Sequence, residues 1–243
     1  YVMGNGGAAT IEAPGAYGVS FYAAEGPGTV LQNFVIRGCD VGVFISGSAP
    51  TIRNVTVVDN TFGIACYSGG RPDISNCILW NNADGDLFDC TARFSCIQQG
   101  AEGEGNISRN PLFGNMYEGD FHLLSSRGRF VPAHGLWAFD EVTSPCVDAG
   151  DPATERAMER TPNGGRINIG AYGGTREASL GGASLSADLN NDGIVDSRDL
   201  EIMFEQWQEV AGPAQTPELA PPQPDPAHWA IGGTPTEVYG GGG

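Results

Sequence analysis

Six residues near the C-terminal end of the chain have the types and spacing of a calcium-binding loop. Within residues 188–199, side-chain oxygens occupy positions 1, 3, 5, 9 and 12, and Gly193 occupies position 6. Calcium takes about six to eight oxygen ligands, and a loop this short can wrap an ion only where a glycine allows a sharp turn. The predicted ligands are Asp188, Asn190, Asp192, the backbone carbonyl of Ile194, Asp196 and Asp199. We therefore expect Ca2+ as a cofactor.

A short helix is expected directly after this loop. One helix face at i, i+3, i+4, i+7 spacing would contain Leu200, Met203, Phe204 and Trp207. Residues 181–184, before the loop, read Gly-Gly-Ala-Ser and predict no helix. A calcium loop with only an exiting helix resembles one repeat of a type I dockerin, which places Ser197 and Arg198 at positions that contact cohesins. Dockerins carry two repeats and this chain shows one, which favours a structural calcium site over cohesin binding. A metal-free acidic turn is the alternative.

Two other groups of acidic residues are candidates for chemistry: Asp84, Asp86 and Asp89 around one predicted bend, and Asp148, Asp151 and Glu155 further along the chain. Glycoside hydrolysis needs carboxylates that converge on one face, which makes the first group the best catalytic candidate. An acidic surface turn is the favoured interpretation of that group. The second group could hold another ion, but we favour a role in capping the fold.

An internal repeat organises residues 31–97. Four similar segments align on the polar residues Asn33, Asn54, Asn76 and Ser95, which are 21, 22 and 19 residues apart, and the first three precede a second motif that begins at Gly42, Gly63 and Gly85. A repeat of this length suits one turn of a parallel β-solenoid, in which strands stack about 4.8 Å apart. An antiparallel sandwich is the alternative, but it would not require a fixed period.

The repeat also predicts which side chains point inward. Ile52, Val55 and Val57 are expected inside the solenoid, with Arg53 and Thr56 facing solvent. The aligned asparagines are expected at a bend, where this residue tolerates unusual backbone angles. Their side chains could hydrogen-bond from one coil to the next.

Several phrases of the sequence resemble known families. Residues 50–60 and 72–82 resemble the repeats of pectate-lyase-like parallel β-helices. Residues 94–98, 103–107, 110–113, 120–123, 144–152 and 162–175 resemble fixed phrases of a secreted bacterial family abundant in planctomycetes. The resemblance implies a right-handed parallel β-helix closed at its C-terminal end by irregular coils. It implies no activity, because that family is known mostly by its fold.

The expected fold class is all-β: a right-handed parallel β-helix, then a small calcium loop and helix (a half-dockerin), then an extended C-terminal linker or strand. The predicted domains are 1–180 (β-helix with capping coils), 186–209 (calcium loop and helix), 210–228 (Pro-rich linker) and 229–243 (the start of a following β-module, or a tail).

Composition narrows the function further. The net charge is −17, with 29 acidic residues and 12 basic ones, all of them arginine. Such a surface repels phosphate backbones and anionic lipids, so nucleic-acid and membrane-surface binding are not expected. Residues 1–243 contain no run of 18 apolar residues, so no membrane insertion is expected either. None of the six cysteines forms a CxxC pair, which argues against zinc; they could be disulfides or apolar filler.

Catalytic bases are sparse in this sequence. Lyases of the pectate-lyase-like fold use a Lys or Arg base, but there is no Lys, and four arginines of the coils fall at scattered phases of the repeat: Arg37, Arg53, Arg71 and Arg93. The histidines His122, His134 and His228 have no metal-ligand spacing. His122 lies in an alternating strand, and we expect it to be half-buried filler.

We therefore predict a non-catalytic structural or adhesion module of a larger protein, secreted or at the cell surface and stabilised by calcium. Possible partners are polysaccharide, neighbouring domains of the same protein, or further copies of the chain in a filament. The alternative is a carbohydrate-active enzyme, a polysaccharide lyase or a glycoside hydrolase, whose catalytic coils lie outside this segment or in the bend at residues 84–89.

The calcium loop gives the first testable prediction. Chelation of Ca2+ should melt the helix at residues 200–207 and leave the solenoid folded, because loop and helix share the ion whereas the solenoid has its own core. Circular dichroism melts with and without chelator measure this. A single transition in which the whole chain unfolds on chelation would contradict it.

Overall fold

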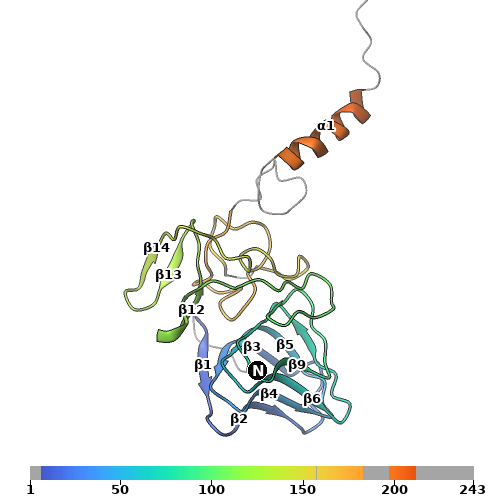
Figure 1. Ribbon diagram of the computed structural model, residues 1–243, viewed down its shortest axis with the longest axis vertical. Coiled ribbons are helices and arrows are strands. Elements are labelled where there is room, and N and C mark those ends of the chain that lie inside the picture. Colours follow the sequence, from blue (N-terminus) through green and yellow to red (C-terminus); the bar gives the residue numbers. More distant parts are fainter. Residues whose placement is uncertain (1–6, 157, 183–196, 212–243) are drawn as a thin grey trace, which may run out of the picture.

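The computed structural model describes residues 7–156, 158–182 and 197–211. Its main body is a parallel β-solenoid with two sheets (Figure 1). The first sheet contains β1 (Ala9–Glu12), β3 (Val30–Arg37), β5 (Thr51–Val58), β7 (Asp73–Ser75), β8 (Ile78–Trp80) and β10 (Cys96–Ile97). The second contains β2 (Tyr17–Phe21), β4 (Val41–Ser46), β6 (Phe62–Tyr67) and β9 (Gly85–Phe88). The right-handed parallel β-helix predicted from the repeat is confirmed.

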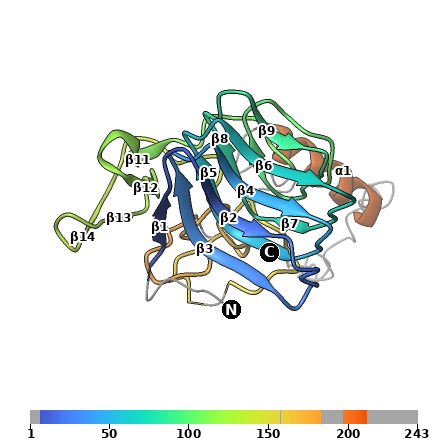
Figure 2. The same ribbon diagram turned by 90° about the horizontal axis from the view of Figure 1, so that it is seen from below.

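Each strand pairs with the strand one coil later, always in parallel. Figure 2 shows β2, β4, β6 and β9 stacked in that order. Ile52 pairs with Leu31 of the coil before and with Ile74 of the coil after. Ile52, Val55 and Val57 are completely buried in the solenoid interior, as predicted.

The asparagines at the first bend have the left-handed backbone that the repeat predicts. The φ angles are +60° at Asn33, +49° at Asn54 and +54° at Asn76. Asparagine tolerates this region because its short side chain bonds locally to the backbone. The predicted coil-to-coil bonding of these side chains is wrong, since they bind a later segment of the chain instead.

A second asparagine column, at the next bend, provides the ladder between coils. Asn60 Nδ2 donates to Asn82 Oδ1 at 3.0 Å, and the backbone N–H of Asn60 donates to the same oxygen at 3.2 Å. Asn60 Oδ1 accepts from the N–H of Cys39 at 2.9 Å, which extends the ladder to the preceding coil. Both asparagines are about 95% buried. The ladder therefore satisfies buried polar groups that the bends would leave unpaired.

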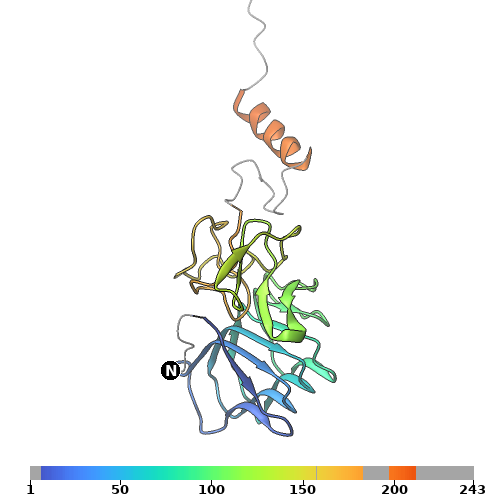
Figure 3. The ribbon, with the colours of Figure 1, turned by 90° about the vertical axis from the view of Figure 1, so that its left-hand side faces the viewer.

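Residues 111–156 and 158–182, here called the covering segment, are mostly irregular. Their regular elements are β11 (Phe113–Asn115), the 3-10 helix η1 (Met116–Glu118), β12 (Asp120–Leu123), β13 (Arg129–Val131) and β14 (Leu136–Ala138), with β11–β12 and β13–β14 antiparallel. Figure 3 shows these coils beside the stacked strands. The α-helix α1 (Ser197–Ala211) follows later in the chain.

The covering segment packs on the outer face of the first sheet. Two clusters of buried side chains join them: one contains Ile78, Cys96, Leu123, Cys146 and Ile169, and the other contains Val35, Val58, Phe121 and Ala171. Thr56, predicted to face solvent, is on this face and is only 1% exposed, because Ala171 covers it and donates its N–H to the hydroxyl at 3.0 Å. The irregular coils expected from the sequence thus cover a side of the solenoid.

The second asparagine column gives the next prediction. Asn82→Ala should lower the free energy of unfolding by about 2–4 kcal/mol, because it leaves several buried partners of the amide unsatisfied. Those partners include the carbonyl of Val57 at 3.1 Å and Asp86 at 2.9 Å. Urea unfolding measures the change, with Asn163→Ala, at a partly exposed asparagine outside the solenoid, as control. Equal stability of the two variants would contradict a structural role for the ladder.

Candidate functional site

The first asparagine column holds the covering segment against the solenoid. Asn33 Nδ2 donates to the backbone carbonyls of Ala171 at 2.8 Å and Gly173 at 3.0 Å. Asn54 Nδ2 donates to two more carbonyls of the same stretch, at residues 168 and 170, at 3.0 and 3.3 Å. These side chains come from successive coils, so the segment runs across the coils and cross-links them.

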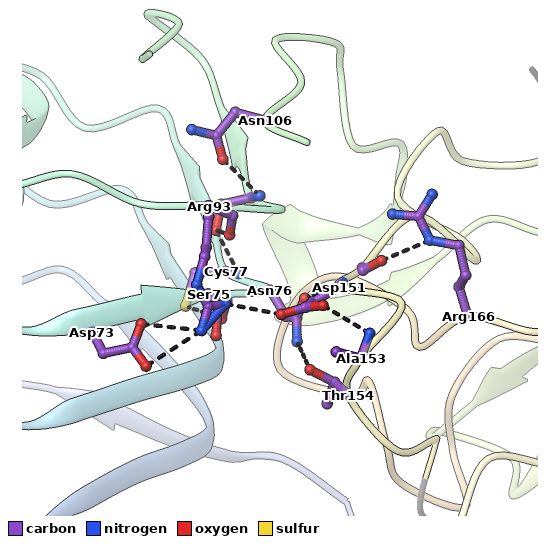
Figure 4. A network of polar contacts seen from close by, with 12 residues as sticks. Asp73, Ser75, Asn76, Cys77, Arg93, Asn106, Asp151, Ala153, Thr154 and Arg166 are labelled. Atoms are coloured by element: carbon purple, nitrogen blue, oxygen red, sulfur yellow. Dashed lines mark hydrogen bonds and ion pairs between the residues drawn. The ribbon is translucent and has the colours of Figure 1, made fainter. Parts of the chain in front are cut away.

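The covering segment is also bound to the next coils, by hydrogen bonds of Asn76 and an ion pair of Arg93 (Figure 4). Asn76 Oδ1 accepts from the N–H of Asp151 at 2.7 Å, and Asn76 Nδ2 donates to Thr154 Oγ1 at 3.3 Å. Arg93 lies between two carboxylates, 2.9 Å from Asp151 and 3.2 Å from Asp73. Asp151, one of the acidic residues singled out in the sequence, therefore serves as an anchor of the covering segment.

The structure does not assemble the predicted acidic group at residues 148–155 into a metal site. Asp151 is paired with Arg93, and Glu155 is exposed. Within residues 7–156, 158–182 and 197–211, no three His, Cys, Asp or Glu side chains are placed to hold a metal ion. Asp148 instead lies close to a carboxylate that the sequence did not single out, Glu159.

Glu159 and Asp148 form a pair of partly buried acids in the covering segment. Glu159 Oε1 accepts from the N–H groups of Asn168 and Gly174, each at 2.9 Å, and its Oε2 is buried without a protein hydrogen-bond partner. Burial raises the pKa of Glu159 to about 7, with a smaller contribution from the charge of Asp148. Burial also raises the pKa of Asp148 to about 6. Sequence reasoning missed Glu159 because it stands alone in an irregular stretch.

The acidic residues at 84–89 are not gathered into a pair of catalytic carboxylates. Asp84 and Asp89 are exposed, whereas Asp86 is only 1% exposed. Asp86 accepts from Asn82 Nδ2 at 2.9 Å and from the N–H of Gln99 at 3.1 Å. Burial raises the pKa of Asp86, and these hydrogen bonds oppose the rise. Its contacts are those of a link between coils.

The prediction that His122 is half-buried filler is wrong, because this side chain is fully buried and makes specific polar and stacking contacts. It lies in β12 as expected, but it is only 1% exposed. Its Nδ1 is 2.7 Å from Asp120, and its ring stacks on Tyr172 with centroids 3.6 Å apart. Asp120 also binds Arg129 at 2.9 Å. The histidine thus joins β12 to residues 168–173, the stretch of the covering segment whose carbonyls the first asparagine column binds.

An exposed aromatic ladder crosses the outer face of the second sheet. It consists of one side chain from each strand: Tyr17, Phe44, Tyr67 and Phe88. Successive ring centroids are 4.6, 5.3 and 5.3 Å apart, and Tyr17, Tyr67 and Phe88 are 41–49% exposed. Sequence reasoning missed this ladder, although each strand of the second sheet contributes one aromatic residue to it.

The predicted calcium site falls mostly outside the residues that the structure describes. Five of its six predicted ligands are not described: Asp188, Asn190, Asp192, Ile194 and Asp196. Asp199, the predicted ligand at position 12, is in the first turn of α1 and is 2% exposed. The predicted helix is confirmed, since residues 200–207 lie within α1. Leu200 and Met203 of the expected apolar face are about half exposed, at 51% and 43%.

Among the comparisons with known proteins, only a family model matches, and it covers only the coils of the solenoid. Residues 8–110 match a family described as "Right handed beta helix region". No curated protein and no solved structure matches the chain. The described helix α1 is not long and apolar enough to cross a membrane. The match agrees with the two parallel sheets and names no activity.

The two buried acids predict a pH dependence of stability. The pKa of Glu159 is near 4.5 in a free chain and about 7 here, so the folded state retains a proton that the unfolded state releases. The resulting stabilisation is complete below about pH 4.5 and is lost as the pH rises through 7, on the order of 2 kcal/mol allowing for partial solvent screening. Asp148 acts in the same direction.

Glu159→Gln should remove most of this loss, because glutamine keeps the accepting oxygen and cannot ionise. Melting temperatures from pH 4 to 8 test this, with the exposed Glu155→Gln as control. A wild-type curve that rises over this range, or variants that both follow the wild type, would contradict the burial of Glu159.

Proposed function

We propose that this chain is a non-catalytic structural or adhesion module of a secreted or cell-surface protein, with the aromatic ladder as its contact surface for polysaccharide. The observation that carries the proposal is the difference between the outer faces of the two sheets. The first face is buried under the covering segment. The second presents the ladder, whose rings at Tyr17, Tyr67 and Phe88 are each more than 40% exposed.

An exposed row of aromatic rings is costly unless a partner covers it. Contiguous apolar patches on a protein surface mark interaction sites more often than chance, whereas single exposed residues do not. The four rings are continuous, since each stacks on the next from Tyr17 to Phe88. The coils fix their spacing, so this surface exists before any partner arrives and loses little entropy on binding.

Polysaccharide is the partner whose chemistry suits this surface best. Sugar rings have apolar faces that pack against aromatic side chains and hydroxyls that need hydrogen-bonding groups beside them. Ser20 and Ser46 pair in register with Phe44 and Tyr67, so hydroxyls stand next to two of the rings. The net charge of −17 works against nucleic acid and anionic lipid as partners.

Calcium belongs to this proposal as a structural ion. The support is the spacing of oxygen side chains in residues 188–199 and the start of α1 at Ser197, position 10 of the loop. Position 12 then falls in the first helical turn, where the buried Asp199 stands. A neighbouring domain of the same protein fits the half-exposed apolar side chains of α1 better than a cohesin, because the chain has a single repeat.

A carbohydrate-active enzyme is the second candidate, and the Glu159–Asp148 pair is the observation in its favour. A general acid for glycoside hydrolysis needs a raised pKa, and burial holds the pKa of Glu159 near 7. Its Oε1, however, is engaged by two backbone N–H groups of the covering segment. Those bonds fit a structural acid better than a group that must reach a substrate.

The ladder makes the proposal testable by mutation. Tyr67→Ala and Phe88→Ala should each weaken binding to the preferred member of a panel of neutral and acidic polysaccharides about tenfold, through loss of aromatic packing. Affinity electrophoresis with calorimetry measures this. The control is Tyr117→Ala, which removes a tyrosine that is 93% exposed and outside the ladder.

Two results would contradict the proposal. One is polysaccharide binding that is unchanged in both ladder variants. The other is release of sugar products by the wild type that Glu159→Gln abolishes, which would favour the enzyme. Light scattering that shows self-association lost in Tyr67→Ala would instead identify a second copy of the chain as the partner.

A further inference from the structure

Two buried cysteines meet where the covering segment contacts the solenoid. Cys96 lies in β10, where its neighbour Ile97 points into the solenoid core while Cys96 belongs to the cluster on the outer face. Cys146 belongs to the covering segment and joins the same outer cluster. Both are 0% exposed. The two thiols therefore come from opposite sides of a single interface.

The backbone on each side is held in place, so this proximity is fixed. The N–H of Cys96 donates to the carbonyl of Cys77 at 2.8 Å, and Cys96 bridges to Ile107 on its other side. The carbonyl of Cys146 accepts from the N–H of Ile169 at 2.9 Å, and its own N–H donates to Ser144 Oγ at 3.1 Å.

Both thiols pack within the same buried outer cluster, and Cys96 Sγ donates to the backbone carbonyl of Arg109 at 3.1 Å. The neighbouring thiol of Cys146 lowers the pKa of Cys96, whereas burial, and after it the nearness of Cys96, raises the pKa of Cys146. An acidic thiol in contact with a second thiol is the arrangement in which thiolate attack and disulfide exchange proceed most easily. All six cysteines are free thiols in the structure.

We propose that Cys96 and Cys146 form a disulfide bond that fastens the covering segment to the solenoid. Each thiol loses a proton, one S–S bond forms, and two electrons pass to an external disulfide such as oxidised glutathione, which becomes two thiols. Exchange takes place before the segment closes, since both sulfur atoms are excluded from solvent afterwards. Such a bond persists in the oxidising conditions outside the cell.

Other cysteines serve as internal controls. Cys39 and Cys77 each donate a thiol hydrogen bond to a backbone carbonyl, at 3.3 and 3.2 Å. Burial, and not a second thiol, is the main cause that raises the pKa of each of them. Cys66 and Cys90 form a second thiol contact, with Cys66 in the solenoid core and Cys90 packed against it.

Peptide mapping tests the bond directly. The chain is refolded in a glutathione redox buffer, its free thiols are alkylated, and it is digested with trypsin without reduction. Cleavage after arginine places Cys96 in the peptide 94–109 and Cys146 in 130–156, apart from every other cysteine. We expect these two peptides joined, and Cys39 alkylated in the peptide 38–53. Alkylated Cys96 and Cys146, or either of them joined to another cysteine, would overturn the proposal.

Stability provides a second readout that does not depend on the digest. The bond closes a loop of 50 residues between Cys96 and Cys146, so its reduction should lower the melting temperature by on the order of 10 °C. The double variant Cys96→Ala/Cys146→Ala should show no such response to reductant, whereas Cys77→Ala, equally buried, should keep it. If Cys96→Ala/Cys146→Ala does not fold, the mapping of the wild type still decides. A wild-type melt that is the same with and without reductant would also overturn the proposal.

Discussion

The rest of this structure depends on the hydrogen bonds made by asparagine side chains at two bends of the coils. A solenoid turns sharply several times per coil, and each turn leaves backbone groups without a strand partner. At one bend, Asn60 and Asn82 satisfy those groups from coil to coil, inside the protein. At the other bend, Asn33 and Asn54 point outward and donate to the backbone of the covering segment. One residue type therefore holds the coils to one another and the covering segment to the coils.

This attachment makes the two sides of the solenoid different. The hydrogen bonds from Asn33 and Asn54 to backbone carbonyls of the covering segment hold this segment on the first sheet. There the covering segment buries Val35, Val58 and Ile78. The second sheet has no such column on its outer face and presents stacked aromatic rings instead. The unusual chemistry divides in the same way. The paired acids lie in the covering segment, and the thiols of Cys96 and Cys146 lie where that segment meets the first sheet. The row of aromatic rings lies on the open sheet.

The sequence predicted those parts of the fold that repeat. The period of about 21 residues, the inward position of Ile52 and the left-handed bend at Asn54 follow from a local pattern that every coil obeys. What the pattern could not supply was contact between distant residues. Asn54 bonds residues more than 110 positions away, and Thr56 is buried by Ala171, so a position that faces outward in the repeat proved to be covered. His122 and Glu159 were misjudged or missed for the same reason, because their surroundings come from separate stretches of chain.

The central proposal is that the open sheet is the face that meets a partner. Hydrogen–deuterium exchange of the full chain, with and without a polysaccharide that it binds, tests this most directly, since exchange reports which backbone becomes protected on binding. We expect new protection in β4, β6 and β9 beneath the aromatic ladder, with the covering segment unchanged. Protection confined to the stretch around Asp148 and Glu159 would contradict it and place the functional surface on the covering segment.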